Sequence, residues 1–268
     1  MKRSKALPRS ILAIVIVYLL IPLLATLLYS LSRTWQATVL PEVWTLQWYV
    51  DLWRDARFGD ALLRTIWTSA VTIGLCLVVM LPAVFVVTVY VPKWEKWLQM
   101  LMLMPYAVPG VVAAVGLIRM YSSGPLAISG TVWILIGAYF VAILPYMYQG
   151  IRNSLRTVHS LELMEAAELL GSGKMTAFRR VIAPAILPGI TVSSLLSLSV
   201  LFGEFVLANL LVGGHFETIQ IYLYRRLNES GHLASAIVMA YFVIILVLSL
   251  IWMRLSKRLF GANGRTGV

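Results

Sequence analysis

The sequence predicts an all-α integral membrane protein with six transmembrane helices. Two features of its composition support this prediction: 60% of the 268 residues are hydrophobic and only 12% are charged, whereas soluble domains carry about 25% charged residues. In addition, six apolar runs are long enough to cross about 30 Å of hydrocarbon, which takes roughly 20 residues. We expect a single domain over residues 1–268, with helices at about 11–31, 66–91, 98–120, 131–151, 187–212 and 233–253.

The first apolar run follows a basic N-terminus, as a signal peptide would. Lys2, Arg3, Lys5 and Arg9 precede it. A signal peptide has an apolar core of about 7–15 residues and a cleavage site of small residues. This run is longer than such a core, and no A-x-A site follows it. We therefore expect an uncleaved first helix.

The loop from Ser32 to Thr65 is long and rich in aromatic residues. These are Trp35, Trp44, Trp48, Tyr49 and Trp53. Trp and Tyr favour the level of the lipid headgroups. The loop is therefore interpreted either as an interfacial belt or as part of a docking surface for a partner outside the cell membrane.

The second run holds the single cysteine, Cys76, which we expect to be a small core residue. The third run contains the sequence MPYAVPG, which begins at Met104. Its two prolines remove backbone donors within about one turn, and carbonyl groups freed in this way must find partners or line a cavity. Broken helices of this kind often mark translocation paths. Pro105, Tyr106 and Pro109 are therefore pore or gate candidates.

A polar segment at 159–184 separates the fourth and fifth runs. We expect two short helices joined by a turn, with Ser160 as the first N-cap. Acidic residues recur along the first helix, at Glu162, Glu165 and Glu168. Gly171 supplies a stop and a bend. The segment could be an amphipathic hairpin lying on lipid or a peg that inserts into a soluble partner.

The fifth run contains Glu204, the one acid within the predicted spans. A charged group at mid-helix costs about 2.5–3.5 kcal/mol on insertion scales, so it should face the bundle or a water-filled path. We expect either a structural link, to Asn209 or a serine, or a gate residue. Glu204 and Asn209 are therefore further pore or gate candidates. The same helix carries a row of small polar residues that favours close packing, made of Ser193, Ser194, Ser197 and Ser199.

The basic residues predict the orientation of the chain. With both termini in the cytoplasm, fifteen Lys and Arg residues lie inside and seven lie outside. This is the distribution that the positive-inside rule favours, so we expect an N-in, C-in topology. Anionic lipid at the cytoplasmic face accounts for the net charge of +11, and no nucleic-acid partner is expected.

The polar segment resembles a motif of permease subunits of binding-protein-dependent ABC importers. That motif is Glu-Ala-Ala, three residues, Gly, nine residues, then an aliphatic residue followed by Leu-Pro two positions later. This chain has Glu165-Ala166-Ala167, Gly171 and Val181, and it ends in Ala183-Pro184, where Ala183 replaces the usual leucine. The six spans extend the resemblance over nearly the whole chain.

The resemblance implies that the segment at 159–184 is a cytoplasmic coupling-helix elbow that docks on an ATPase. It marks Glu165, Ala166, Ala167, Gly171 and Pro184 as ATPase-coupling residues. It also implies the surrounding assembly: a dimer of two ATPase subunits, a second permease that is identical or homologous, an extracytoplasmic solute-binding protein, and the lipid of a bacterial inner membrane. ATP and Mg would be bound by the ATPase, with no cofactor, metal or catalytic residue in this chain.

Two other functional classes were weighed. An ion-coupled secondary transporter needs ionisable relay groups in its spans, and Glu204 alone is thin support. A membrane enzyme needs a catalytic cluster, but the three histidines are dispersed among the loops. The run Gly171-Ser172-Gly173-Lys174 imitates the end of a phosphate-binding loop, yet it lacks the earlier glycine and the Ser or Thr after lysine.

The solute is predicted from a weaker resemblance. The segment Trp44–Tyr49 and the end of the fifth helix are similar to permeases of the spermidine/putrescine group. We therefore expect a polyamine. The alternatives are phosphonate, iron or sulfate-type ions.

Overall fold

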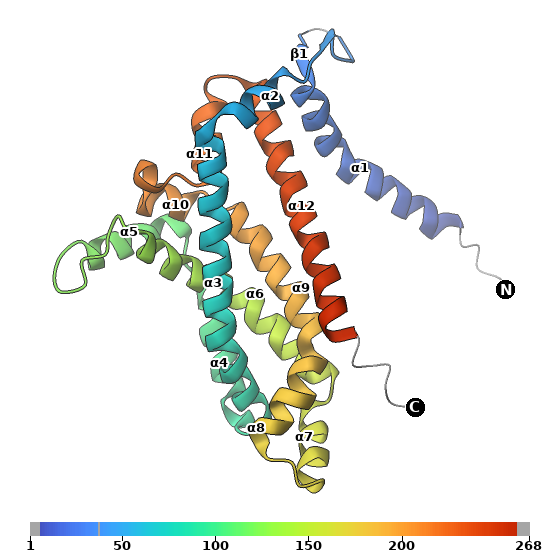
Figure 1. The fold of residues 1–268 in the computed structure, drawn as a ribbon, viewed down its shortest axis with the longest axis vertical. Coiled ribbons are helices and arrows are strands. Elements are labelled where there is room, and N and C mark those ends of the chain that lie inside the picture. Colours follow the sequence, from blue (N-terminus) through green and yellow to red (C-terminus); the bar gives the residue numbers. More distant parts are fainter. Residues whose placement is uncertain (1–5, 37, 262–268) are drawn as a thin grey trace. The chain divides into compact units, whose positions relative to one another are not determined.

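The computed structural model describes residues 6–36 and 38–261, and these are mostly helical (Figure 1). Lys2, Arg3 and Lys5, which contributed to the orientation prediction, lie outside the described residues. The chain divides into two compact units. One unit combines Met1–Asp60 with Tyr222–Ile244, and the other combines Ala61–Ile221 with Ile245–Val268.

The first unit contains the N-terminal elements of the chain and parts of its last two helices. They are α1 (Ala6–Ser30), β1 (Ser32–Thr34), β2 (Val43–Trp44), α2 (Gln47–Arg54), the start of α3 (Ala56–Val89), the end of α11 (Ile219–Leu227) and the first part of α12 (Gly231–Gly261). The short antiparallel β ribbon was not expected. It folds the aromatic loop back on itself by pairing Ser32 with Trp44.

The end of α1 is held by polar and aromatic contacts within this unit. The His232 ring stacks on Tyr29 with 4.0 Å between centroids, and its Nδ1 lies 2.9 Å from Ser32 Oγ. The Ser30 hydroxyl forms a 2.7 Å hydrogen bond with the Tyr49 hydroxyl. These contacts fix α1 at its extracytoplasmic end, while the described side chains along most of its length are exposed.

The second unit contains the remaining elements and the rest of α3, α11 and α12. The new elements are η1 (Pro92–Trp94), α4 (Glu95–Leu103), η2 (Met104–Ala107), α5 (Gly110–Tyr121), α6 (Val132–Thr157), α7 (Ser160–Leu169), α8 (Lys174–Ala177), the π-helical turn η3 (Phe178–Ile182), α9 (Ala183–Phe202), α10 (Val206–Leu211) and η4 (Gly213–Phe216). Helix α6 supplies more residues to the hydrophobic core of this unit than any other element, and α3 supplies the next largest group. Cys76 is fully buried in this core, as expected.

Helices α6 and α9 pack closely because glycine on each faces serine on the other. A Cβ added to Gly150 would lie 2.2 Å from Ser193 Cβ, and one added to Gly189 would lie 1.7 Å from Ser154 Oγ. The two reciprocal pairs mean that the helices run in opposite directions. Small residues at such a crossing allow backbones to approach closely in a membrane.

Five helices of the described chain are long and apolar enough to span a membrane, and a bent pair makes a sixth. The third span is broken where the sequence predicted a break, and its two parts, Pro92–Ala107 and Gly110–Tyr121, meet at 98°. The cause is the pair of prolines at the break, which remove backbone donors. The fifth helix ends at Phe202, before the predicted end at Val212, because the chain turns at Gly203.

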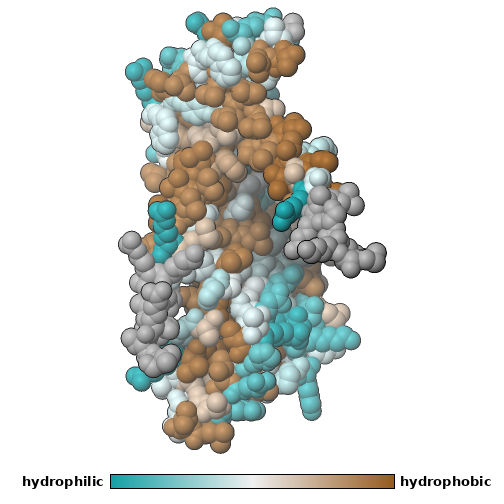
Figure 2. All heavy atoms as spheres, turned by 90° about the vertical axis from the view of Figure 1, so that its right-hand side faces the viewer, coloured by the Kyte–Doolittle hydropathy of each residue, from teal (hydrophilic) through white to brown (hydrophobic). Residues whose placement is uncertain are grey.

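Apolar side chains cover much of the face shown in Figure 2, and polar side chains gather on other parts of it. Large hydrophobic residues are exposed along α1, α3 and α12, including Leu12, Val78 and Val243. Apolar surface of this extent suits contact with lipid rather than water.

Candidate functional site

The elbow is built from α7 and α8, which lie beyond the ends of α6 and α9 (Figure 1). The chain enters α7 through His159, which has a φ of 50°. This left-handed conformation is uncommon for a residue other than glycine. His159, rather than Ser160, is therefore the N-cap residue, and Ser160 is buried in the first turn. The two helices are separated by a turn at Gly171, whose φ is 80°.

One face of the elbow packs on the membrane part of the second unit. Met164 is 2% exposed and Ala177 is 1% exposed, and both belong to the hydrophobic core. These contacts order the elbow without covering its opposite face. The predicted first helix and its glycine turn are therefore confirmed, whereas the second helix, α8, continues through η3 into α9.

The opposite face of the elbow combines acidic and apolar side chains. Glu162, Glu165 and Glu168 are exposed along α7. At its tip, Leu169 and Leu170 are 89% and 88% exposed. Two exposed leucines next to three carboxylates form a surface that is complementary to a partner's groove with an apolar floor and a basic rim.

The predicted coupling residues occupy three different environments. Glu165, Ala166 and Gly171 are exposed on the elbow. Ala167 is buried in the core, so its small side chain serves packing inside this chain. Pro184 is half-buried near the start of α9 and directly follows the π-helical turn. That turn continues α8 into α9, so the helix runs through Pro184 without a break.

The run Gly171-Ser172-Gly173-Lys174, which resembles the end of a phosphate-binding loop, makes a contact with another part of this chain. Lys174 Nζ lies over the Tyr90 ring, 4.8 Å from its centroid. Lys174 begins α8 after an extended Gly173, and α7 rather than a strand precedes the turn. The lysine therefore serves a cation–π contact between α8 and the end of α3.

A cavity of about 780 Å³ lies along the broken third span. Its walls are mainly apolar and come from α4, η2, α5, α6 and the region around α10. Pro105 and Tyr106 line it, as does Tyr146, whose ring meets Tyr106 edge-on at 5.8 Å. Glu204 is the one charged residue among the lining residues.

Glu204 lies just past the end of α9 and caps α10. Its Oε1 accepts a 2.8 Å hydrogen bond from the Leu207 N–H, and its Oε2 accepts a 3.1 Å bond from the Ala208 N–H. The expected link to Asn209 or a serine is therefore replaced by backbone partners. Asn209 is exposed on α10 and is absent from the cavity lining, as is Pro109, the N-cap residue of α5.

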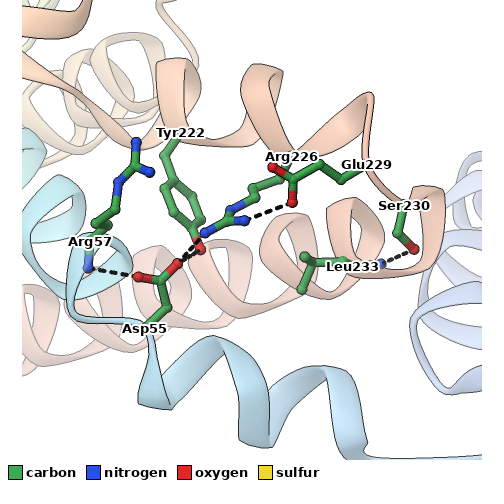
Figure 3. Close-up of polar contacts among 7 residues, drawn as sticks. All are labelled: Asp55, Arg57, Tyr222, Arg226, Glu229, Ser230 and Leu233. Carbon is green, nitrogen blue, oxygen red and sulfur yellow. Dashed lines mark hydrogen bonds and ion pairs between the residues drawn. The ribbon is translucent and has the colours of Figure 1, made fainter.

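A second polar site, in the first unit, was not predicted from the sequence. Asp55 Oδ2 accepts a 2.8 Å bond from the Tyr222 hydroxyl and a 2.6 Å bond from Arg226, which also pairs with Glu229 (Figure 3). Burial raises the pKa of the Asp55 carboxyl. The hydrogen bonds from Tyr222, the Arg57 N–H and Arg226 outweigh burial and hold that pKa below its ordinary value.

Asp55 and Tyr222 come from loops that the topology prediction placed on the same outer side. Their contact agrees with that prediction. The signal that could have identified this site was the presence of opposite charges at helix ends on one side of the membrane. The described residues contain no cluster of His, Cys, Asp or Glu able to hold a metal ion.

Sequence comparisons place the chain among membrane transport proteins. The family described as binding-protein-dependent transport system inner membrane component matches residues 80–261. The chain is 30% identical over 251 residues to the protein assigned as 2-aminoethylphosphonate transport system permease protein PhnV of Salmonella typhimurium, covering 91% of each. It is 28% identical over 143 residues to the spermidine/putrescine transport system permease protein PotC of Haemophilus influenzae, covering 53% of this chain and 54% of PotC.

Solved structures share the fold. A chain of the bacterial alginate ABC transporter, solved in complex with an alginate pentasaccharide-bound periplasmic protein, matches with a TM-score of 0.73, 18% identity, and coverage of 100% of this chain and 98% of that one. A chain of the MetNI methionine ABC transporter in an inward-facing conformation matches with a TM-score of 0.60, 17% identity, and coverage of 80% and 97%. At these identities the likeness shows the fold alone.

Proposed function

Because the chain belongs to the family of binding-protein-dependent transport system inner membrane components, we propose that its elbow receives a cytoplasmic ATPase. The chain is a permease subunit of an ABC importer in the bacterial inner membrane, and it is not itself an enzyme. This membership sets aside the ion-coupled transporter and the membrane enzyme considered from the sequence. ATP hydrolysis belongs to the partner subunit.

The observation that carries this proposal is the exposed outer face of the elbow. Leu169 and Leu170 would insert into an apolar groove of the ATPase, and Glu165 would pair with a basic group at the rim of that groove. Gly171 gives the turn its left-handed bend, which a side chain would strain. The buried inner face, including Ala167, would pass movement of the ATPase to α6 and α9.

The pore is proposed to form between this chain and a second permease. The cavity along the broken third span would be this subunit's part of the path, with Pro105, Tyr106 and Glu204 in its wall. The second permease would also engage the second ATPase. An extracytoplasmic binding protein would deliver the solute.

For the solute, we propose 2-aminoethylphosphonate ahead of the polyamine expected from the sequence. The match to PhnV covers 91% of this chain, whereas the match to PotC covers 53%. Both solutes carry an aliphatic amine, which is an ammonium ion at neutral pH. The Glu204 carboxylate in an otherwise apolar wall is a suitable partner for such a cation, particularly in a site of low dielectric.

The elbow is tested by the charge reversal Glu165→Lys. The exposed position leaves folding and membrane insertion intact, because surface substitutions usually change stability by less than about 0.5 kcal/mol. We expect the ATPase to stop co-purifying with the permease and ATP-driven uptake to be lost. Arg179→Glu, also exposed and on the η3 turn, is the control for charge reversal as such. Normal uptake together with normal ATPase co-purification by Glu165→Lys would show that the elbow is not the docking site.

A further inference from the structure

An ion-pair cluster in the second unit joins the start of α4 to the end of α6. We call it the Glu95 cluster, and it consists of Glu95, Arg152 and Arg156. Arg152 Nε lies 2.6 Å from Glu95 Oε1. An Arg156 NH2 group lies 2.9 Å from the same oxygen and 3.1 Å from Glu95 Oε2. Both oxygens of a single carboxylate are therefore engaged by two guanidinium groups.

The geometry and burial of this cluster distinguish it from an ordinary surface ion pair. The side chains of Glu95 and Arg152 are each 19% exposed, while that of Arg156 is 54% exposed. Isolated pairs in water contribute little to stability. Here, hydrogen bonds to an ionised group, several of them on one acceptor, give both strength and a defined orientation.

On the α6 side, the cluster lies next to the elbow. Arg152 and Arg156 are four residues apart on α6, so they project from the same face of the helix. Only Thr157 and Val158 separate Arg156 from His159, the left-handed residue that begins the elbow. About one turn of chain therefore separates the cluster from α7.

On the α4 side, the cluster leads to the cavity. Glu95 is the first residue of α4, whose nine residues span about 13 Å at the rise of an α-helix. The far end of α4 supplies Leu101 and Met102 to the cavity wall, and η2 with Pro105 follows directly. A short stiff helix thus runs from the cluster to the break in the third span.

From these contacts we infer that the Glu95 cluster transmits movement of the elbow to the broken third span. Glu95, Arg152 and Arg156 are positioning residues: they hold α4 to the last turns of α6, so that η2 moves when the elbow moves. The inference rests on the proposal that the ATPase docks on the elbow.

The test uses the purified importer, with its ATPase and binding protein, in lipid nanodiscs. Val108, which is exposed and lines the cavity at the break, is changed to Cys in every variant as a reporter. The only native thiol, Cys76, is fully buried. The measurement is the rate of maleimide labelling with and without ATP and vanadate. It does not depend on which solute is carried.

In the Val108→Cys parent we expect trapping by ATP and vanadate to change the labelling rate by about fivefold, the lower end of typical coupling between sites. Glu95→Gln should retain the ATPase and its hydrolysis but lose this response. Arg152→Gln should do the same, and the double variant should be no worse than either single one. Glu95→Asp, which keeps the charge, should recover part of the response.

The matched control is Lys96→Gln, which changes the charge of the adjacent exposed residue by one unit. It should respond as the parent does. A full response in Glu95→Gln, or no response in the parent, would overturn the inference. Failure of the docking proposal has a different signature, because Glu165→Lys would then retain the ATPase.

Discussion

At the scale of single residues, Glu204 shows how an acid inside a membrane protein can serve the backbone. The chain breaks after Phe202, which leaves the first N–H groups of α10 without partners in the helix. The carboxylate accepts hydrogen bonds from two of them, at Leu207 and Ala208. Its charge is placed at the positive end of a helix, which offsets part of the cost of burying it.

Replacing Glu204 with Gln should leave the protein folded but reduce transport. The amide keeps one acceptor oxygen, so one of the two capping bonds is lost, which costs about 1 kcal/mol. The lost charge also removes the proposed partner of a cationic solute from the cavity wall. Yield from detergent and initial uptake rate by the reconstituted importer are the measurements. Glu42→Gln, an exposed acid outside the cavity, is the control.

Uptake at the control rate by Glu204→Gln would mean that the cap and the charge are both dispensable.

Individual residues also differ in how well their roles could be predicted. The turn at Gly171 follows from local sequence, because glycine readily adopts positive φ. The role of Glu204 depends on where the chain breaks, and Leu201–Phe205 carries no proline to indicate that position.

At the scale of elements, α6 and α9 are the pair that flanks the elbow. The serine row on α9 was expected to serve packing, and this is confirmed for Ser193, which faces Gly150. Because Ser154 and Gly189 repeat the arrangement in reverse, the two helices interlock at two levels. Backbones held this closely should move together when the elbow is displaced.

Replacing Gly150 with Ala should destabilise the protein and separate these helices. The added Cβ would lie 2.2 Å from Ser193 Cβ, an atom that no rotamer change can remove. Overpacking of this kind costs about 1–3 kcal/mol. The thermal midpoint of the purified protein should therefore fall. Gly74→Ala on α3 is the control, since its Cβ would meet nothing within 4 Å.

The double variant Gly150→Ala with Ser193→Gly exchanges the two residues' sizes across the same contact. It should recover most of the lost thermal stability. If Gly150→Ala melts at the control temperature, the close crossing does not limit stability. If the double variant recovers nothing, the loss has another origin.

The limits of the predicted elements have a physical explanation. Hydrophobic length identified every span, because lipid demands long apolar segments. It could not give the 98° bend in the third span, since prolines indicate a break without setting its angle. Nor could it reveal the β ribbon at Ser32–Thr34, because strands of two or three residues carry too little pattern.

At the scale of the whole molecule, the distribution of charge predicted which loops lie on the same side of the membrane. Glu95 contacts Arg152, and both were placed in the cytoplasm from the count of basic residues. The particular partners could not be predicted, because contacts over 57 positions depend on how helices pack. The same limit applies to the cavity, which arises only when α4, α5, α6 and α10 come together.

The complete importer should prefer 2-aminoethylphosphonate to polyamines. We expect radiolabelled 2-aminoethylphosphonate to enter proteoliposomes that contain the permease, its ATPase and its binding protein. Excess unlabelled putrescine should compete weakly, because it offers an ammonium group without the phosphonate. Ethylphosphonate, which lacks the amine, should also compete weakly if Glu204 contributes to selection.

Labelled putrescine that enters faster than 2-aminoethylphosphonate would restore the polyamine prediction. Omitting ATP supplies the control for leakage. A solute of neither class would leave the ABC importer assignment standing, because that assignment rests on the family match rather than on the cargo.

The π-helical turn at Phe178–Ile182 sets the rotational phase between the elbow and the fifth span. A π turn holds one residue more than an α turn over the same stretch. Each residue of an α-helix turns the chain by about 100°. Removing that residue would give an uninterrupted α-helix from Lys174 to Phe202, but it would rotate the elbow's acidic face away from its present direction. The direction of the proposed docking surface therefore depends on a single extra residue in η3.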